Sequence, residues 1–224
     1  MNLHLDGLDW ALIASSLAAS LAYGLVYARQ QPSPVRSLIK TIPVAGLALL
    51  AALNDAPILL VAALALGALG DLLLALGSDK TFLAGLVAFL TSHLLYVVVF
   101  IPLAVAPTMT GTLVGFVLVI AASIIARQLW PGLGAMRVPV MAYFVVILAM
   151  GTTAWALPEA LWLATFGATL FIASDAILSY EMFKLKPDAK ARAWTPYAVW
   201  FLYFGAQACL AAAFLLRTPQ TYSI

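Results

Sequence analysis

The stretch GALGDLLLALGSDKTFLAGLVAFLTSHLLYVVVF, residues 67–100, decides the fold of this chain. It contains two long apolar runs joined by a short polar turn at residues 77–80, which predicts two membrane-spanning helices. Each run carries one ionisable residue, Asp71 in the first and His93 in the second. An ionisable side chain inside a bilayer costs several kcal/mol, so such a residue is normally retained for a function. Asp71 and His93 therefore mark the expected functional site.

The composition of the whole chain is typical of a membrane protein. Of its 224 residues, 65% are hydrophobic and 9% are charged, and the mean hydropathy is +1.06. A soluble domain has about 25% charged residues, so that class is excluded. The net charge of +2, without a Lys/Arg-rich run, predicts the lipid bilayer and no nucleic acid as a partner. The single cysteine, Cys209, gives no disulfide framework, and neither a metal nor a cofactor is expected.

Apolar runs of roughly 17–22 residues predict an all-α polytopic protein that forms one transmembrane domain over residues 1–224. The eight predicted spans are residues 8–28, 37–53, 57–77, 81–101, 111–129, 137–156, 158–180 and 195–216. Turn-forming residues, mainly Pro, Gly, Asn and Asp, occupy the breaks between them. Spans six and seven nearly touch, so a fused or shortened pair is also compatible with the sequence.

Lysine and arginine gather in the loops on one side of the membrane. Of the 11 such residues, all except Arg217 lie in or beside loops 1–2, 3–4, 5–6 and 7–8. These are Arg29, Arg36, Lys40, Lys80, Arg127, Arg137, Lys184, Lys186, Lys190 and Arg192. Because basic loops stay in the cytoplasm, we expect both termini to be extracytoplasmic. The oligomeric state is not indicated by the sequence.

Two pairs of similar segments lie four spans apart. Residues 70–75, GDLLLA, resemble residues 174–179, SDAILS, and residues 40–44, KTIPV, resemble residues 137–140, RVPV. A parallel repeat of two four-helix halves leaves such a pattern. Small residues and prolines also coincide by chance in apolar sequence, so repeat and coincidence both stay open.

Polar residues inside the predicted spans identify the candidate site. At 1.5 Å per residue, Asp71 and Asp175 both lie roughly 8–10 Å inside the cytoplasmic boundary. One buried aspartate can be structural, but two at equal depth on different helices favour a shared site. Other candidates lie at comparable or greater depth: His93, Tyr96, Tyr143, Tyr203 and Gln207. Lys40 and Arg137 are either topology markers or ligands of a lipid phosphate.

The order and spacing of these residues resemble the YhhN family of integral membrane proteins. The matching segments are Gly70-Asp71, Phe82-x-x-Gly85-x-x-x-Phe89-x-x-x-His93-x-x-Tyr96, Lys40-x-x-Pro43, Pro139-x-x-x-Tyr143, Ser174-Asp175 and Tyr203-x-x-x-Gln207. Characterised relatives are lysoplasmalogenases, so the resemblance implies hydrolysis of the vinyl ether of lysoplasmalogens (alkenylglycerophosphoethanolamine or alkenylglycerophosphocholine) to a fatty aldehyde and a glycerophospho-base. It also implies that Asp71 and Asp175 are catalytic, and it suggests a bacterial inner membrane.

The chemistry of a vinyl ether suits two carboxyl groups in a site of low dielectric constant. Cleavage begins with protonation of the β-carbon, and water then captures the resulting oxocarbenium ion as a hemiacetal. One carboxylic acid can donate the proton while a second, ionised carboxylate stabilises the cation. His93, Tyr143, Tyr203 or Gln207 can hold the water or orient a carboxyl group. Lys40 and Arg137 at the mouth of the pocket would suit the phosphate of the lysophospholipid.

Two other classes of protein use the same residue types. A proton-coupled transporter of small molecules or lipids also has intramembrane Asp and His, and a four-plus-four repeat fits that class. A metal-dependent membrane hydrolase would use Asp71, His93 and Asp175 as ligands, but no second histidine accompanies them in the spans. The transporter predicts flux without chemistry, and the metal enzyme predicts sensitivity to chelators.

Overall fold

A computed structural model describes residues 5–186 and 188–216, so Arg217 lies outside the described residues. Within them the chain forms eight long helices and no strand. The helices are α1 (Gly7–Ala22), α2 (Pro34–Leu53), α3 (Ile58–Ala75), α4 (Asp79–Phe100), α5 (Met109–Leu129), α6 (Arg137–Ala154), α7 (Trp162–Phe183) and α8 (Thr195–Leu215). A π-helical segment, Tyr23–Tyr27, continues α1.

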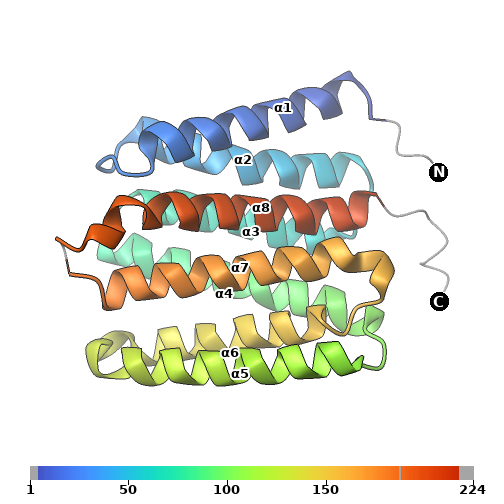
Figure 1. Cartoon of the computed structure of the whole chain (residues 1–224). Coiled ribbons are helices and arrows are strands. Elements are labelled where there is room, and N and C mark those ends of the chain that lie inside the picture. Colours follow the sequence, from blue (N-terminus) through green and yellow to red (C-terminus); the bar gives the residue numbers. More distant parts are fainter. Residues whose placement is uncertain (1–4, 187, 217–224) are drawn as a thin grey trace.

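Each helix runs antiparallel to the one before it in the chain, and together they form an elongated bundle (Figure 1). The connections α1–α2, α3–α4, α5–α6 and α7–α8 lie together at the end drawn on the left, which we call the basic end because it carries the lysines and arginines of those loops. All eight helices, with their short extensions, are long and apolar enough to cross a membrane. The prediction of an all-α protein with eight spans is therefore confirmed, whereas the internal repeat stays a prediction.

Helix starts at the basic end are set by polar caps. The Ser33 side chain accepts a hydrogen bond from the Arg36 backbone N–H, and Pro34 occupies the first helical position, so α2 begins three residues before the predicted start. Ser78 and Thr81 form a capping box, and α4 accordingly starts at Asp79 rather than at residue 81. These caps fix the ends of the two helices that carry Lys40 and His93.

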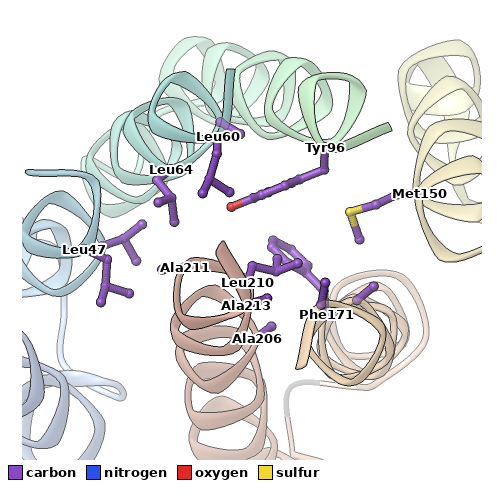
Figure 2. Close-up of a cluster of buried hydrophobic side chains, with 14 of the residues drawn as sticks. Leu47, Leu60, Leu64, Tyr96, Met150, Phe171, Ala206, Leu210, Ala211 and Ala213 are labelled. Carbon is purple, nitrogen blue, oxygen red and sulfur yellow. The ribbon is translucent and has the colours of Figure 1, made fainter. Parts of the chain in front are cut away.

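Helix α8 is at the centre of the bundle and α5 is at its edge. Of the residues in the most apolar 18-residue window of each helix, 56% are buried inside the protein in α8 but only 6% in α5. Figure 2 shows Tyr96 of α4 pointing toward α8, with Met150 of α6 and Phe171 of α7 on its other side. Large apolar side chains on the outer faces stay exposed, for example Phe116 on α5 and Ile58 on α3. An outer surface of this kind suits a lipid environment.

Two glycines bring α3 close to the helices that complete the site. A Cβ atom at Gly67 would lie 2.6 Å from Nε2 of Gln207 on α8. A Cβ atom at Gly70 would lie 2.6 Å from the ring of Phe89 on α4. Both glycines are on the same helix as Asp71, so small residues at this surface allow the close approach of its neighbours.

Candidate active site

A cavity of about 360 Å³ lies at the basic end of the bundle, and both Asp71 and Asp175 are in its wall. Its other residues come from the π-helical segment and from α2, α3, α4, α6, α7 and α8. Most of the lining is apolar, including Leu74, Phe82, Leu86, Val140, Phe144 and Leu178. A mostly apolar pocket with a few convergent polar groups is the usual form of a site for a small or lipid-like ligand.

The Asp71 carboxylate is paired on both oxygens. The Lys40 ammonium on α2 lies 3.3 Å from its Oδ1, and the Tyr203 hydroxyl on α8 donates to its Oδ2 at 2.6 Å. Asp71 is 1% exposed, and the Lys40 side chain is 14% exposed. A buried carboxylate without partners would be costly, and here one ammonium and one hydroxyl compensate it.

A chain of hydrogen bonds continues from Asp71 into the core. The Gln207 side-chain amide donates toward the Tyr203 hydroxyl at 3.5 Å, and the Tyr96 hydroxyl donates to Gln207 Oε1 at 2.6 Å. Gln207 and Tyr96 are fully buried and do not line the cavity. They orient Tyr203, so their role in the site is indirect.

Asp175 has a simpler environment. The Tyr143 hydroxyl on α6 donates to its Oδ2 at 2.6 Å. Among the described residues no lysine or arginine forms an ion pair with Asp175, and the residue is only partly buried. Its Oδ1 has no hydrogen bond from the described residues. Asp175 is thus a carboxyl group in a mostly apolar cavity without a counter-ion.

His93 lies behind the cavity rather than in its wall. Its ring packs against Phe171 and Tyr143 at centroid distances of 4.4 Å and 5.2 Å. Its Nδ1 is 2.6 Å from the Phe89 carbonyl oxygen, so Nδ1 carries the proton and donates. The buried Nε2 has no hydrogen-bond partner among the described residues.

The structure separates the two basic residues that the sequence places at the pocket mouth. Lys40 lines the cavity, but its ammonium contacts Asp71. Arg137 is exposed at the start of α6, is absent from the cavity wall, and turns back to the preceding turn. Its guanidinium lies 5.2 Å from the Trp130 ring centroid and donates to the Trp130 carbonyl oxygen at 3.3 Å.

The polar residues of the wall that the sequence analysis does not name as site residues include Tyr23, Arg36 and Glu181. Arg36 precedes Lys40 by four residues and so shares its helix face, which is a usable signal. In the sequence, Arg36 stands out only as one of the basic residues of the loops. Tyr23 belongs to the π-helical segment, which apolar periodicity does not reveal. Glu181 lies beyond the predicted end of span seven because α7 continues to Phe183.

The site offers two aspartate carboxyl groups, one with a cationic partner and one without, and three tyrosines in an apolar cavity. Such a set can donate a proton, stabilise a nearby cation and exclude bulk water. Within residues 5–186 and 188–216, no three His, Cys, Asp or Glu side chains cluster as metal ligands would.

Comparison with known proteins gives a consistent assignment. The sequence profile of the YhhN family matches residues 35–214. Two proteins named lysoplasmalogenase, from Mycobacterium bovis and Mycobacterium tuberculosis, are each 34% identical over 161 residues, covering 69% of this chain. The match spans 59% of the length of these relatives. No solved structure matches the chain.

Proposed function

Since the chain belongs to the YhhN family of membrane proteins, we propose that it is a lysoplasmalogenase. The substrates would be alkenyl lysophospholipids with an ethanolamine or choline headgroup, cleaved to a fatty aldehyde and a glycerophospho-base. The observation that carries this proposal is that Asp71 and Asp175 both line one apolar cavity, each with a tyrosine hydroxyl at 2.6 Å. The relatives' name supports the same activity.

Asp175 is the general acid in the proposed reaction. Because an uncompensated charge is costly in an apolar cavity, the carboxyl group without a counter-ion is the one that carries a proton. The Tyr143 hydroxyl donates to Oδ2, which leaves Oδ1 to hold the proton that is transferred. Asp175 gives this proton to the β-carbon of the vinyl ether, and the α-carbon and ether oxygen then share a positive charge.

Asp71 is the ionised partner. Lys40 and Tyr203 hold it as a carboxylate, and its negative charge lies on the wall of the cavity in which the oxocarbenium ion forms. Water adds to the α-carbon and loses a proton to a carboxylate, which gives a neutral hemiacetal. The hemiacetal hydroxyl then loses its proton and becomes the aldehyde carbonyl as the bond between carbon and the glycerol oxygen breaks, and the glycerol oxygen takes up a proton from a carboxylic acid and leaves as an alcohol.

The test uses purified protein with a lysoplasmalogen and with its saturated alkyl-ether analogue. Protonation at carbon requires the double bond, so the vinyl ether should be cleaved and the alkyl ether should bind but stay intact. In deuterated water, prompt trapping should find one deuterium on the carbon next to the aldehyde. An aldehyde without deuterium would contradict carbon protonation by an acid. Movement of the lipid across the membrane without any cleavage would favour the transporter alternative.

We also propose that the basic end faces the cytoplasm and that both termini are extracytoplasmic, in a bacterial inner membrane. The support is the ten-to-one distribution of basic residues. In a Cys209→Ala background, Asp188→Cys should resist an impermeant thiol reagent added to intact cells. Glu159→Cys, exposed at the opposite end, is the matched control and should be labelled. The reverse pattern would overturn the orientation.

A further inference from the structure

The mouth of the cavity carries one cation and one anion in addition to the Lys40–Asp71 pair. Arg36 on the first turn of α2 and Glu181 near the end of α7 both line the cavity. Both belong to the basic end, whereas Asp71 lies deeper in the bundle. Along α2, Arg36 and Lys40 are separated by one helical turn, or about 6 Å of rise.

Arg36 is a cation held in place without a counter-ion. Its guanidinium donates to the Tyr27 carbonyl oxygen at 3.2 Å, to the Ala75 carbonyl oxygen at 3.5 Å and to the Tyr23 hydroxyl at 3.0 Å. None of these acceptors is a carboxylate, and Arg36 has no ion pair among the described residues. A guanidinium has five N–H donors, so two remain for a ligand. A fixed guanidinium with free donors is suited to a phosphate.

Lys40 cannot serve that purpose in the same way. Its ammonium is already compensated by Asp71 at 3.3 Å, and moving it to a phosphate would leave a buried carboxylate without its cation. The two basic residues on this face of α2 thus have different partners. Lys40 belongs to the catalytic carboxylate, and Arg36 is free to bind an anion.

Glu181 provides the complementary charge. Its Oε1 lies 3.5 Å from NH1 of Arg192, and its buried Oε2 has no partner among the described residues. Apart from the two aspartates, Glu181 is the one carboxylate in the described cavity wall. A carboxylate oxygen without a donor is suited to an ammonium group.

The geometry points to a headgroup subsite at the cavity mouth that binds a zwitterionic phosphodiester, with its phosphate on Arg36 and its ammonium near Glu181. This inference rests on the proposed function, and it names the residues that select the substrate. A glycerol unit separates the phosphate of such a lipid from its vinyl ether. With the phosphate on Arg36, the ether is directed one helical turn deeper, toward Lys40 and Asp71.

The test measures binding of saturated ether lipids, which are not cleaved. Alkylglycerol, alkylglycerophosphate and alkylglycerophosphoethanolamine share one chain and differ only in headgroup. Arg36→Gln should weaken binding of both phosphate lipids about tenfold to hundredfold and leave alkylglycerol unchanged. Glu181→Gln should weaken only the ethanolamine lipid, by about fivefold.

Matched variants separate charge recognition from folding. Arg127→Gln removes an exposed arginine of α5 at the same end, and it should change none of the three affinities. Arg192→Gln breaks the ion pair with Glu181 but keeps its carboxylate, so the preference for the ethanolamine lipid should persist. The subsite would be overturned if Arg192→Gln lost the preference for the ethanolamine lipid. It would also be overturned if Arg36→Gln weakened binding of all three lipids equally.

The headgroup subsite and the proposed enzymatic activity can be refuted separately. A protein that binds by headgroup but cleaves no lysoplasmalogen would keep the subsite and refute the proposed enzyme. A protein that cleaves lysoplasmalogen but binds the three analogues equally would keep the enzyme and refute the subsite. Free glycerophosphoethanolamine at the lipid's concentration should not displace the lipid. Full displacement would show that the site selects a soluble phosphodiester, contrary to the lipid-headgroup assignment.

Discussion

The two carboxyl groups of the cavity, Asp71 and Asp175, differ in their partners. Each accepts a hydrogen bond of 2.6 Å from a tyrosine, but only Asp71 has a cation, the Lys40 ammonium at 3.3 Å. Asp71 is also the more buried of the two. If the chain contains the repeat suggested by its sequence, Arg137 is the counterpart of Lys40, yet Arg137 contacts Trp130 instead of Asp175.

The difference shows that two aspartates in one cavity can have different electrostatic surroundings. A buried carboxylate is tolerated as an anion where a cation and a hydroxyl compensate it. The same group in an apolar cavity without a cation is more favourable as a neutral acid. The comparison is the basis for proposing Asp175 as the proton donor and Asp71 as the stabilising charge.

The largest effect is expected for Asp175→Asn. An asparagine cannot give up a proton, so turnover should fall by about a thousandfold or more, toward the upper range for general acids. Single-turnover cleavage of the vinyl ether measures the loss, and binding of the alkyl-ether analogue serves as the control for folding. Activity within tenfold of the wild type would remove Asp175 from proton transfer.

Asp71→Asn should cost about a hundredfold to a thousandfold in turnover, because one stabilising charge is lost from the transition state. It should also destabilise the protein by about 3 kcal/mol, since the Lys40 ammonium, only partly exposed to the cavity, loses its carboxylate. Thermal unfolding in detergent measures this change. The double variant Lys40→Met with Asp71→Asn should regain most of the stability but not the activity. Recovery of activity in the double variant would contradict a catalytic role for Asp71.

The two tyrosines provide a finer comparison. Tyr143→Phe removes the hydrogen bond that Asp175 receives, and it should lower kcat by about tenfold to thirtyfold. Tyr203→Phe leaves Lys40 beside Asp71, so its effect on kcat should be smaller, about threefold to tenfold. Phenylalanine keeps the ring packing in both variants. If Tyr203→Phe lowers kcat as much as Tyr143→Phe does, or more, the proposed roles of Asp175 and Asp71 are wrong.

The smallest effect is expected from metal removal. Both oxygens of Asp71 are engaged by Lys40 and Tyr203, so a cation bridging the two carboxylates would have to displace the ammonium. Activity should stay unchanged after incubation with a chelator and desalting. Loss that one divalent ion restores would mean that Asp71 and Asp175 are ligands rather than an acid and a stabilising charge.

Much of the fold could be predicted because each apolar run is long enough to span a bilayer and is ended by a turn. The observed helix boundaries differ from the predicted ones where a side chain caps the helix, as at Ser33 and Ser78. They also differ where a helix continues past a charged residue, as α7 does at Glu181. Hydropathy averages over a window, so it does not register single hydrogen bonds at a helix end.

The two aspartates of the cavity wall can be named as candidates from the sequence, but their specific partners cannot. Intramembrane Asp71 and Asp175 stand out as isolated charges, whereas the pairing of Lys40 with Asp71 depends on how α2 faces α3. The position of Arg137 depends on the turn before α6, which brings Trp130 beneath its guanidinium. Contacts of this kind join different helices, and periodicity along one helix carries no information about them.

The size of the cavity has a consequence for the products. A volume of about 360 Å³ lies near the lower end of the range for pockets that hold drug-sized ligands, and a long-chain lysophospholipid is larger than such a ligand. In the proposed reaction, the end of the aliphatic chain would then stay in the surrounding hydrocarbon throughout. The aldehyde would be left dissolved in the bilayer, and the glycerophospho-base would leave to the aqueous phase. Partition between two phases would keep the products apart and make the reaction difficult to reverse.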